Sequence, residues 1–195
     1  MGKGWEEKLA GFISTDCEEQ EIIQYGLHQG GWTLLYLTFI LACAWLWEEW
    51  LFSILVFAGV FVLRPYAGGY HADTEIRCFL LSTGIMNAAM ATRKFLDVFS
   101  LPGMCAYVYF VFLILLFSPL QNPIHPLTEP EQFQYAKRAK GIVIIYNLLL
   151  GIGLLMKANI FCDSIIYTVF IVGISVLAGK WKYRVSYIAR LRRKL

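Results

Sequence analysis

The sequence predicts an all-α integral membrane protein with six transmembrane helices, and three observations lead to this fold class. Hydrophobic residues make up 58% of the 195 positions and charged residues only 16%, whereas about 25% charged is typical of a soluble domain. The apolar residues are gathered in blocks close to the roughly 20 residues that span a hydrocarbon core. Positive charges collect between alternate blocks, as they do in the cytoplasmic loops of membrane proteins.

Six apolar blocks are the candidates for these spans. The fourth is the clearest, whereas the second and third are short, so their helices must extend into flanking polar residues. Arg64 and Pro65 are expected to end the second helix, because proline disfavours helical conformation in the residue before it. In chain order the blocks are 31–47, 50–63, 79–91, 98–117, 141–156 and 164–179.

The distribution of Lys and Arg predicts the orientation. If all six blocks span and the N-terminus is cytoplasmic, 14 of the 17 Lys and Arg residues lie on the cytoplasmic side, and only Arg93, Lys94 and Lys157 lie outside. The positive-inside rule therefore places both termini in the cytoplasm. The adjacent Arg93 and Lys94 are the discordant pair, and we expect them to extend towards the membrane interface.

A single domain with three parts follows from this pattern. Residues 1–30 are expected to form amphipathic helices on the cytoplasmic membrane surface, because Trp5, Leu9, Phe12 and Ile13 are spaced as one apolar face beside charged residues. Residues 31–179 form the six-helix membrane domain. Residues 180–195 form a basic cytoplasmic tail with seven cations. We interpret this tail as an anchor on anionic lipid heads, and the alternative is a binding site for an acidic partner segment.

The loop between the second and third blocks carries the two residues best suited to catalysis, His71 and Cys78. Asp73 can cap the third helix, which would then begin at Thr74 and place Cys78 just past its first turn. A helix N-terminus and the nearby Arg77 both favour a thiolate at that position. Upstream, the paired glycines 68–69 allow a sharp turn or a close approach to a ligand.

Geometry limits how His71 and Cys78 could work together. Seven residues of continuous helix would separate them by about 10.5 Å along the axis, whereas a base must come within roughly 3 Å of its nucleophile. We therefore predict a chain break at Ala72–Asp73. A thiolate formed by proton transfer to the imidazole could then attack a carbonyl and form an acyl-enzyme thioester. Asp73 and Glu75 are candidates for a third, orienting group by sequence proximity alone.

Several other interpretations remain open from the residues alone. A loop histidine could bind lipid phosphate beside a passive cysteine. A zinc site would need more than these two ligands, and the five scattered cysteines contain no CxxC pair, so neither a metal, a disulfide framework nor any other cofactor is predicted.

The same loop resembles the accessory gene regulator B (AgrB) family of bacterial membrane peptidases. The similar features are Arg64, the Gly68-Gly69 pair, the segment Gly69-Tyr-His71-Ala, and Cys78 at an H-x6-C spacing. Tyr25-Gly26-Leu27 and the proline-rich segment 118–126 also resemble the family, and the likeness covers about residues 18–180.

The resemblance implies that Cys78 is the nucleophile of a cysteine endopeptidase and that His71 is its general base. It implies an AgrD-like precursor peptide as substrate, with an amphipathic N-terminal segment and an acidic C-terminal extension that the enzyme removes. An internal cysteine or serine of the peptide would then close a thiolactone or lactone, giving a quorum-sensing signal. Thioester exchange needs no ATP, but water must be kept from the acyl-enzyme. The family also implies a homodimer in the bacterial cytoplasmic membrane with its site on the cytoplasmic side, and no nucleic-acid partner is expected.

Further residues are candidates for binding the substrate. Arg64, Gly69 and Arg77 lie in the loop itself, and His28 stands where the family generally has Glu or Gln, so it could help to orient the catalytic pair. The alternative for His28 is a partly exposed interfacial residue. The cytoplasmic cations at 137, 138 and 140 could attract the acidic part of the precursor, or could simply reflect positive-inside topology. They are Lys137, Arg138 and Lys140.

Two other classes of function compete with a peptidase. A small-molecule or peptide transporter is one, but the predicted spans contain no clear charged residue of the kind that marks transport pathways. Asn87 and Asn147 are the only strongly polar residues deep in a span. The other class is a non-catalytic scaffold whose basic cytoplasmic face recruits a partner.

Overall fold

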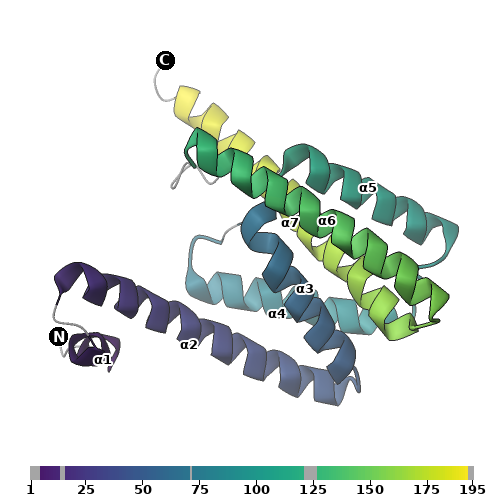
Figure 1. Ribbon diagram of the computed structural model, residues 1–195, viewed down its shortest axis with the longest axis horizontal. Coiled ribbons are helices and arrows are strands. Elements are labelled where there is room, and N and C mark those ends of the chain that lie inside the picture. The colour runs from purple at the N-terminus through teal and green to yellow at the C-terminus, as the bar shows by residue number, and fades with distance from the viewer. Residues whose placement is uncertain (1–4, 14–15, 71, 121–126, 193–195) are drawn as a thin grey trace.

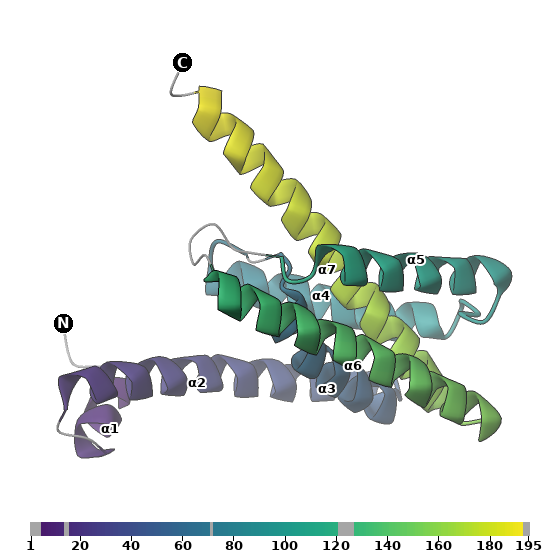
Figure 2. The same cartoon turned by 45° about the horizontal axis from the view of Figure 1, so that its top comes forward.

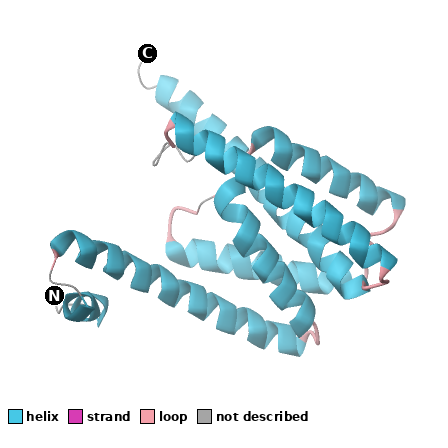
Figure 3. Ribbon diagram, in the orientation of Figure 1, coloured by secondary structure: helices cyan, strands magenta, loops and turns pink. Residues whose placement is uncertain are grey.

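Helices make up nearly all of the chain in the computed structural model, which describes residues 5–13, 16–70, 72–120 and 127–192. Within these ranges there is no β-strand, and short turns join the helices (Figure 3). The seven helices of the described part are α1 (Trp5–Ile13), α2 (Cys17–Leu46), α3 (Trp50–Ala67), α4 (Glu75–Arg93), α5 (Leu101–Phe117), α6 (Glu129–Leu155) and α7 (Asn159–Arg192).

The predicted all-helical membrane architecture is confirmed in its coarser form. Four helices are long and apolar enough to cross a membrane, and they include all of α3 and α6 and most of α2 and α7. The apolar α5 is shorter, at 17 residues, and the 19-residue α4 is less apolar than the others. The count of six spans therefore stays a prediction.

The long helix α7 forms the centre of the bundle. It packs most extensively against α3 and then against α5 (Figure 2). Ile166, Val169, Val172 and Val176 are fully buried and recur every three or four residues, which places them on one side of the helix. A Cβ atom on Gly59 of α3 would lie 2.6 Å from the Thr168 hydroxyl, so a small residue is what lets these two helices approach.

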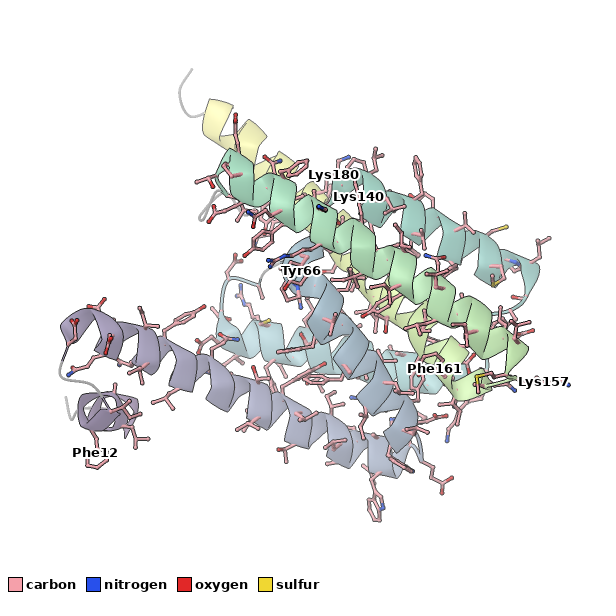
Figure 4. The ribbon with its side chains drawn as sticks, viewed as in Figure 1. Phe12, Tyr66, Lys140, Lys157, Phe161 and Lys180 are labelled. Atoms are coloured by element: carbon pink, nitrogen blue, oxygen red, sulfur yellow. The ribbon has the colours of Figure 1, made fainter. Side chains whose placement is uncertain are left out.

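The helix α2 lies at the edge of the bundle. Its later part contacts α3 and α4, while its beginning extends away from the other long helices and carries α1 (Figure 1). Ala10 of α1 is buried, whereas Phe12 is 90% exposed at the outer surface (Figure 4). The boundaries predicted after residues 30 and 179 both fall inside continuous helices, α2 and α7.

The end predicted for the second span is wrong by one turn. The helix α3 continues through Arg64 and Pro65 to Ala67. Proline removes one backbone hydrogen bond, and this matters little so close to a helix end. The helix stops at Gly68, which takes a φ of 72° and donates its N–H to the Arg64 carbonyl at 2.9 Å, because glycine adopts positive φ without steric conflict.

Arg93 is held in an ion-pair cluster, which corrects the expectation that it simply extends to the interface. Its guanidinium donates to both carboxylate oxygens of Glu49, at 2.7 and 2.6 Å, and to Asp163 at 3.0 Å. The side chains are only 18%, 9% and 15% exposed, in the order Arg93, Glu49 and Asp163. Asp163 lies within the candidate span of α7 but one residue before the predicted block 164–179, so the prediction that the spans contain no clear charged residue stays a prediction.

Candidate functional site

The segment that joins α3 to α4 leaves the helix at Gly68 and begins the next helix at Glu75. A break in the helix at Ala72–Asp73 was predicted, and the described residues 68–70 and 72–74 all lie outside the two helices, so the break is longer than predicted. His71 itself lies outside the described residues, so its predicted pairing with Cys78 stays a prediction. The described residues on both sides of it, and Cys78, define the surroundings of the candidate site.

Cys78 is positioned by the cap of α4. Thr74 is the N-cap, and its hydroxyl accepts the backbone N–H of Arg77 at 3.3 Å. The predicted cap Asp73 is therefore wrong by one residue, because its carboxylate instead accepts a hydrogen bond from Lys182 of α7. Cys78 donates its N–H to the Thr74 carbonyl at 3.0 Å and is half-buried, so it stands at the close of the first turn, where the helix dipole favours a negative charge.

His28 of α2 reaches the first turn of α4. Its Nε2 lies 2.7 Å from the Glu75 carboxylate and 3.2 Å from the indole nitrogen of Trp32. One ring nitrogen cannot donate to Glu75 and accept from Trp32 at once. The shorter contact, to a charged acceptor, favours the tautomer in which Nε2 donates to Glu75. Because Glu75 and Cys78 are three residues apart, they share one side of α4.

Aromatic residues of α2 line the same region. Trp32 and Tyr36 follow His28 at intervals of four residues and pack against Phe79, with ring centroids 6.3 Å apart in both cases. The Tyr36 hydroxyl also donates to the Ser82 carbonyl of α4 at 3.3 Å. One side of α2 therefore supplies a largely aromatic wall against Phe79, the residue after the predicted nucleophile.

Arg64 and Gly69 both shape the loop. The Arg64 guanidinium donates to the Tyr70 carbonyl at 2.6 Å, so the last turn of α3 holds the residue before His71. Gly69 is buried with a φ of 146°, and a Cβ at this position would lie 2.5 Å from the hydroxyl oxygen of Ser175. Arg77, the other loop candidate, is exposed.

The basic run of α6 lies at the same end of the bundle as this loop. The Arg138 guanidinium is 5.5 Å from the ring centroid of Tyr66, a residue in the last turn of α3. Lys137 and Lys140 are exposed. Figure 4 shows Tyr66 and Lys140 at one end of the bundle and Lys157 at the other.

The pKa of the Asp73 carboxyl is shifted by a contact that the sequence did not indicate. The hydrogen bond and positive charge of Lys182 lower the pKa of the Asp73 carboxyl below its usual value. The two residues are 109 positions apart. Ser175 and Tyr183 of α7 also contact the loop, at Tyr70 and Gly69. Sequence reasoning missed all three α7 residues, and the only available signal was that position 182 belongs to the basic segment on the predicted cytoplasmic side.

The structure thus brings together part of the predicted set. His28 meets the first turn of α4, Arg64 and Gly69 hold the loop, and Arg138 reaches the end of α3. Glu75, one of the two candidates for an orienting group, is engaged by His28, and Asp73, the other, by Lys182.

Comparisons with known proteins agree on one family. Residues 6–176 match the family described as accessory gene regulator B. An AgrB-like protein of Clostridium perfringens strain SM101 is 24% identical over 162 residues, which cover 79% of this chain and 76% of that protein. A second AgrB-like protein, from Clostridium perfringens strain 13, is 23% identical over 161 residues, covering 78% and 75%. No solved structure matches this chain.

Proposed function

The chain belongs to the accessory gene regulator B (AgrB) family, and from this premise we propose that it is a membrane cysteine endopeptidase that processes an AgrD-like precursor peptide. Membership of the family implies the processing of an autoinducer peptide. In our proposal the enzyme removes the acidic C-terminal extension of the precursor and promotes closure of the remaining peptide to a thiolactone or lactone.

The observation that carries this proposal is the position of Cys78 at the close of the first turn of α4, directly after a loop of 68–74 that breaks the helix. The break is the condition under which His71 could approach the sulfur, since a continuous helix would hold the two residues apart.

The chemistry assigned to the pair conserves bonds and charge at each step. The His71 imidazole takes the proton of Cys78, and the thiolate attacks the carbonyl that precedes the acidic extension. The imidazolium returns the proton to the leaving amine, so the extension departs and a thioester remains on Cys78. A cysteine thiol or serine hydroxyl within the bound peptide then attacks this thioester, closes the ring and releases the Cys78 thiol.

The residues around the pair have proposed roles in binding. Trp32 and Tyr36 pack against Phe79, the residue after Cys78, and this apolar cluster is proposed to favour ring closure over hydrolysis by limiting access of water. His28 and Glu75 are proposed to orient groups at the start of α4. Arg77, with Lys137 and Arg138 of α6, is proposed to attract the acidic extension, and Arg64 and Gly69 to shape the loop that receives it.

The proposed setting is the bacterial cytoplasmic membrane, with six spans, both termini and the site on the cytoplasmic side, and an anionic inner leaflet against the basic tail. The lengths of the two uncertain spans support this count. At 1.5 Å per residue, the 17 residues of α5 and the 19 of α4 extend for about 26 and 28 Å, close to the roughly 30 Å of a hydrocarbon core. A homodimer is proposed from the family.

The test is processing of a co-expressed precursor by Cys78→Ala and His71→Ala variants. We expect both to abolish processing while their amounts in the membrane stay at the wild-type level, because each removes one partner of the proton transfer. Cys105→Ala is the matched control, since Cys105 is an exposed cysteine of α5 away from the loop. Processing by Cys78→Ala at the wild-type rate would reject the peptidase.

One observation favours a second candidate function, a small-molecule or peptide transporter. The cluster of Arg93, Glu49 and Asp163 holds partly buried ionisable groups, one of them in the candidate span of α7, and ionisable groups within spans often mark transport pathways. Its one cation is paired with both carboxylates, however, which also suits a purely structural role. Substrate flux into proteoliposomes that persists in Cys78→Ala would favour transport.

A further inference from the structure

We propose that α7 contains positioning residues of the site: Ser175, Gly179 and Lys182 anchor the loop that joins α3 to α4 on both sides of position 71. The catalytic consequence rests on the proposed function, because it concerns the approach of a general base to Cys78. The anchoring itself rests only on contacts between described residues. Lys182 is not assigned a catalytic role, because it acts through the loop.

The side of the loop that precedes position 71 is fixed to α7 by the backbone. The N–H of Tyr70 donates to the Ser175 carbonyl at 2.9 Å and to its hydroxyl at 3.1 Å. The Tyr183 hydroxyl donates to the Gly69 carbonyl at 3.3 Å. The carbonyl of Tyr70, in turn, accepts a hydrogen bond from Arg64 of α3 at 2.6 Å. Tyr70 is therefore held between the end of α3 and the middle of α7.

The side that follows position 71 is fixed by Lys182. Its ammonium donates to the Asp73 carboxylate, and the same nitrogen lies 4.9 Å from the ring centroid of Tyr70, within the range of a cation–π contact. One side chain of α7 thus contacts the residue before position 71 and the second residue after it. A shift of α7 would move both sides of the loop together.

Close packing makes this anchor rigid. A Cβ on Gly179 would lie 2.7 Å from the carbonyl carbon of Gly69 and 2.9 Å from the nitrogen of Tyr70. Both obstacles are backbone atoms, which cannot move aside as a flexible side chain would. Gly179 is therefore required for the contact between α7 and the loop. Gly69 is required on the other side because other residues rarely adopt its φ of 146° and because its Cβ would lie 2.5 Å from the Ser175 hydroxyl oxygen.

Proton transfer depends steeply on position, and a displacement of about 1 Å can lower a rate by roughly 100-fold. Loss of the anchor should therefore lower kcat while leaving substrate binding nearly unchanged. The expected fall in kcat distinguishes a positioning role from the role that the charge of the basic tail suggests, which is attraction to lipid heads or to an acidic segment. A cation that only attracts would affect KM or membrane association instead.

The experiment compares full-length Lys182→Met, Gly179→Ala and Lys180→Met in lipid nanodiscs with a synthetic precursor. Lys180 is the matched control, because it is exposed and its ammonium lies over the Phe117 ring of α5, whereas that of Lys182 contacts Tyr70 and Asp73. We expect Lys182→Met and Gly179→Ala to lower kcat by about 10- to 100-fold with KM within about 2-fold of wild type, and Lys180→Met to change neither. The charge exchange Asp73→Lys with Lys182→Asp should recover kcat to within about 3-fold.

Hydrogen exchange of the backbone amides of 68–74 gives a readout that does not depend on activity. We expect the Tyr70 amide to exchange faster in Lys182→Met and Gly179→Ala than in Lys180→Met. Wild-type kcat in both anchor variants, while Cys78→Ala is inactive, would overturn the positioning role and leave the peptidase intact. If the wild-type protein processes no precursor, the peptidase fails, and equal exchange in all three variants would then overturn the anchor as well.

Discussion

At the scale of single residues, the surroundings of Cys78 differ from those of the other described cysteines. Cys162 is buried in α7, Cys105 is exposed on the apolar α5, and Cys43 is half-buried within α2. Cys78 and Cys162 are each the fourth residue of a helix, but only Cys78, among the four cysteines whose side chains the structure describes, lies in the turn that follows the loop between α3 and α4. That position is why the proposal assigns Cys78, rather than the other three, as the nucleophile.

The contact between His28 and Glu75 leads to a first prediction at this scale. His28→Gln should keep near-wild-type processing, because an amide can still donate to the Glu75 carboxylate, whereas His28→Ala should lower the rate by about 2- to 5-fold. The small size of the effect reflects side chains that are 40% and 55% exposed, since exposed pairs contribute about 0–1 kcal/mol. Processing rates of the purified variants measure it, with Gln29→Ala as the neighbouring control. Equal losses in both His28 variants would count against a role for the hydrogen bond.

The Asp73 carboxyl leads to a second prediction, on pH. Its pKa is lowered in the folded protein by Lys182, so its contribution to stability is complete above the unfolded pKa of about 3.9 and is lost only as pH falls through the lower folded value. The ratio of wild-type to Asp73→Asn processing rates should therefore stay constant between about pH 5.5 and 8. A ratio that approaches one near pH 6 would show that the pair breaks at a much higher pH than these pKa values allow.

At the scale of helices, the Arg93 cluster ties three helix ends together. Glu49 precedes the first turn of α3, Arg93 ends α4, and Asp163 lies in the second turn of α7. The guanidinium is also 5.1 Å from the ring centroid of Phe52. In the proposed orientation Arg93 lies on the side of the membrane that is poor in Lys and Arg, and these contacts would explain why a cation is tolerated there, because carboxylates of the protein balance its charge.

Removing Arg93 should therefore destabilise the fold. We expect Arg93→Met to lower the free energy of unfolding by about 3–5 kcal/mol, since it leaves two partly buried carboxylates without a cation. The adjacent Lys94→Met should change it by less than about 0.5 kcal/mol, because Lys94 is exposed and lies over the Trp47 ring instead. Equilibrium unfolding in detergent micelles measures both, and similar midpoints for the two variants would contradict a structural role for the cluster.

At the scale of the whole molecule, the two ends of the bundle differ in charge and in structure. The loop with Cys78 and the basic residues of α6 lie at one end, where Figure 4 shows Lys140 and Lys180, while Lys157 lies at the opposite end. In the proposed orientation the first end faces the cytoplasm. A precursor with an acidic extension would therefore meet the site and the positive charges on the same side of the membrane.

This arrangement predicts a salt-dependent effect on substrate capture. The double variant Lys137→Glu with Arg138→Glu should raise KM by roughly 10-fold at low ionic strength and leave kcat nearly unchanged, and the difference should shrink as salt is added. Lys157→Glu, at the other end of the bundle, is the control. Steady-state kinetics with a precursor in nanodiscs would measure it, and a fall in kcat with unchanged KM would assign these cations another role.

Much of the helical architecture could be predicted because it depends on local sequence. Each of the six apolar blocks lies wholly or largely within a helix, since a run of apolar side chains on helix-forming backbone needs no distant partner. Predictions of the exact residue at a helix end were less accurate, because neighbouring residues can fill the same role. The helix α3 ends at Gly68 rather than at Pro65, and α4 is capped by Thr74 rather than by Asp73.

The sequence by itself determined a helical membrane protein, a broken helix before Cys78 and a basic segment near the site, because hydrophobic runs, glycine pairs and charge are local properties. Only the tertiary structure decided which side chains meet across 40 to 110 positions, as His28 meets Glu75, Arg93 meets Glu49 and Asp163, and Lys182 meets Asp73. Such contacts depend on how helices cross and rotate as they pack. That packing is set jointly by all the buried side chains, and no single stretch of sequence encodes it.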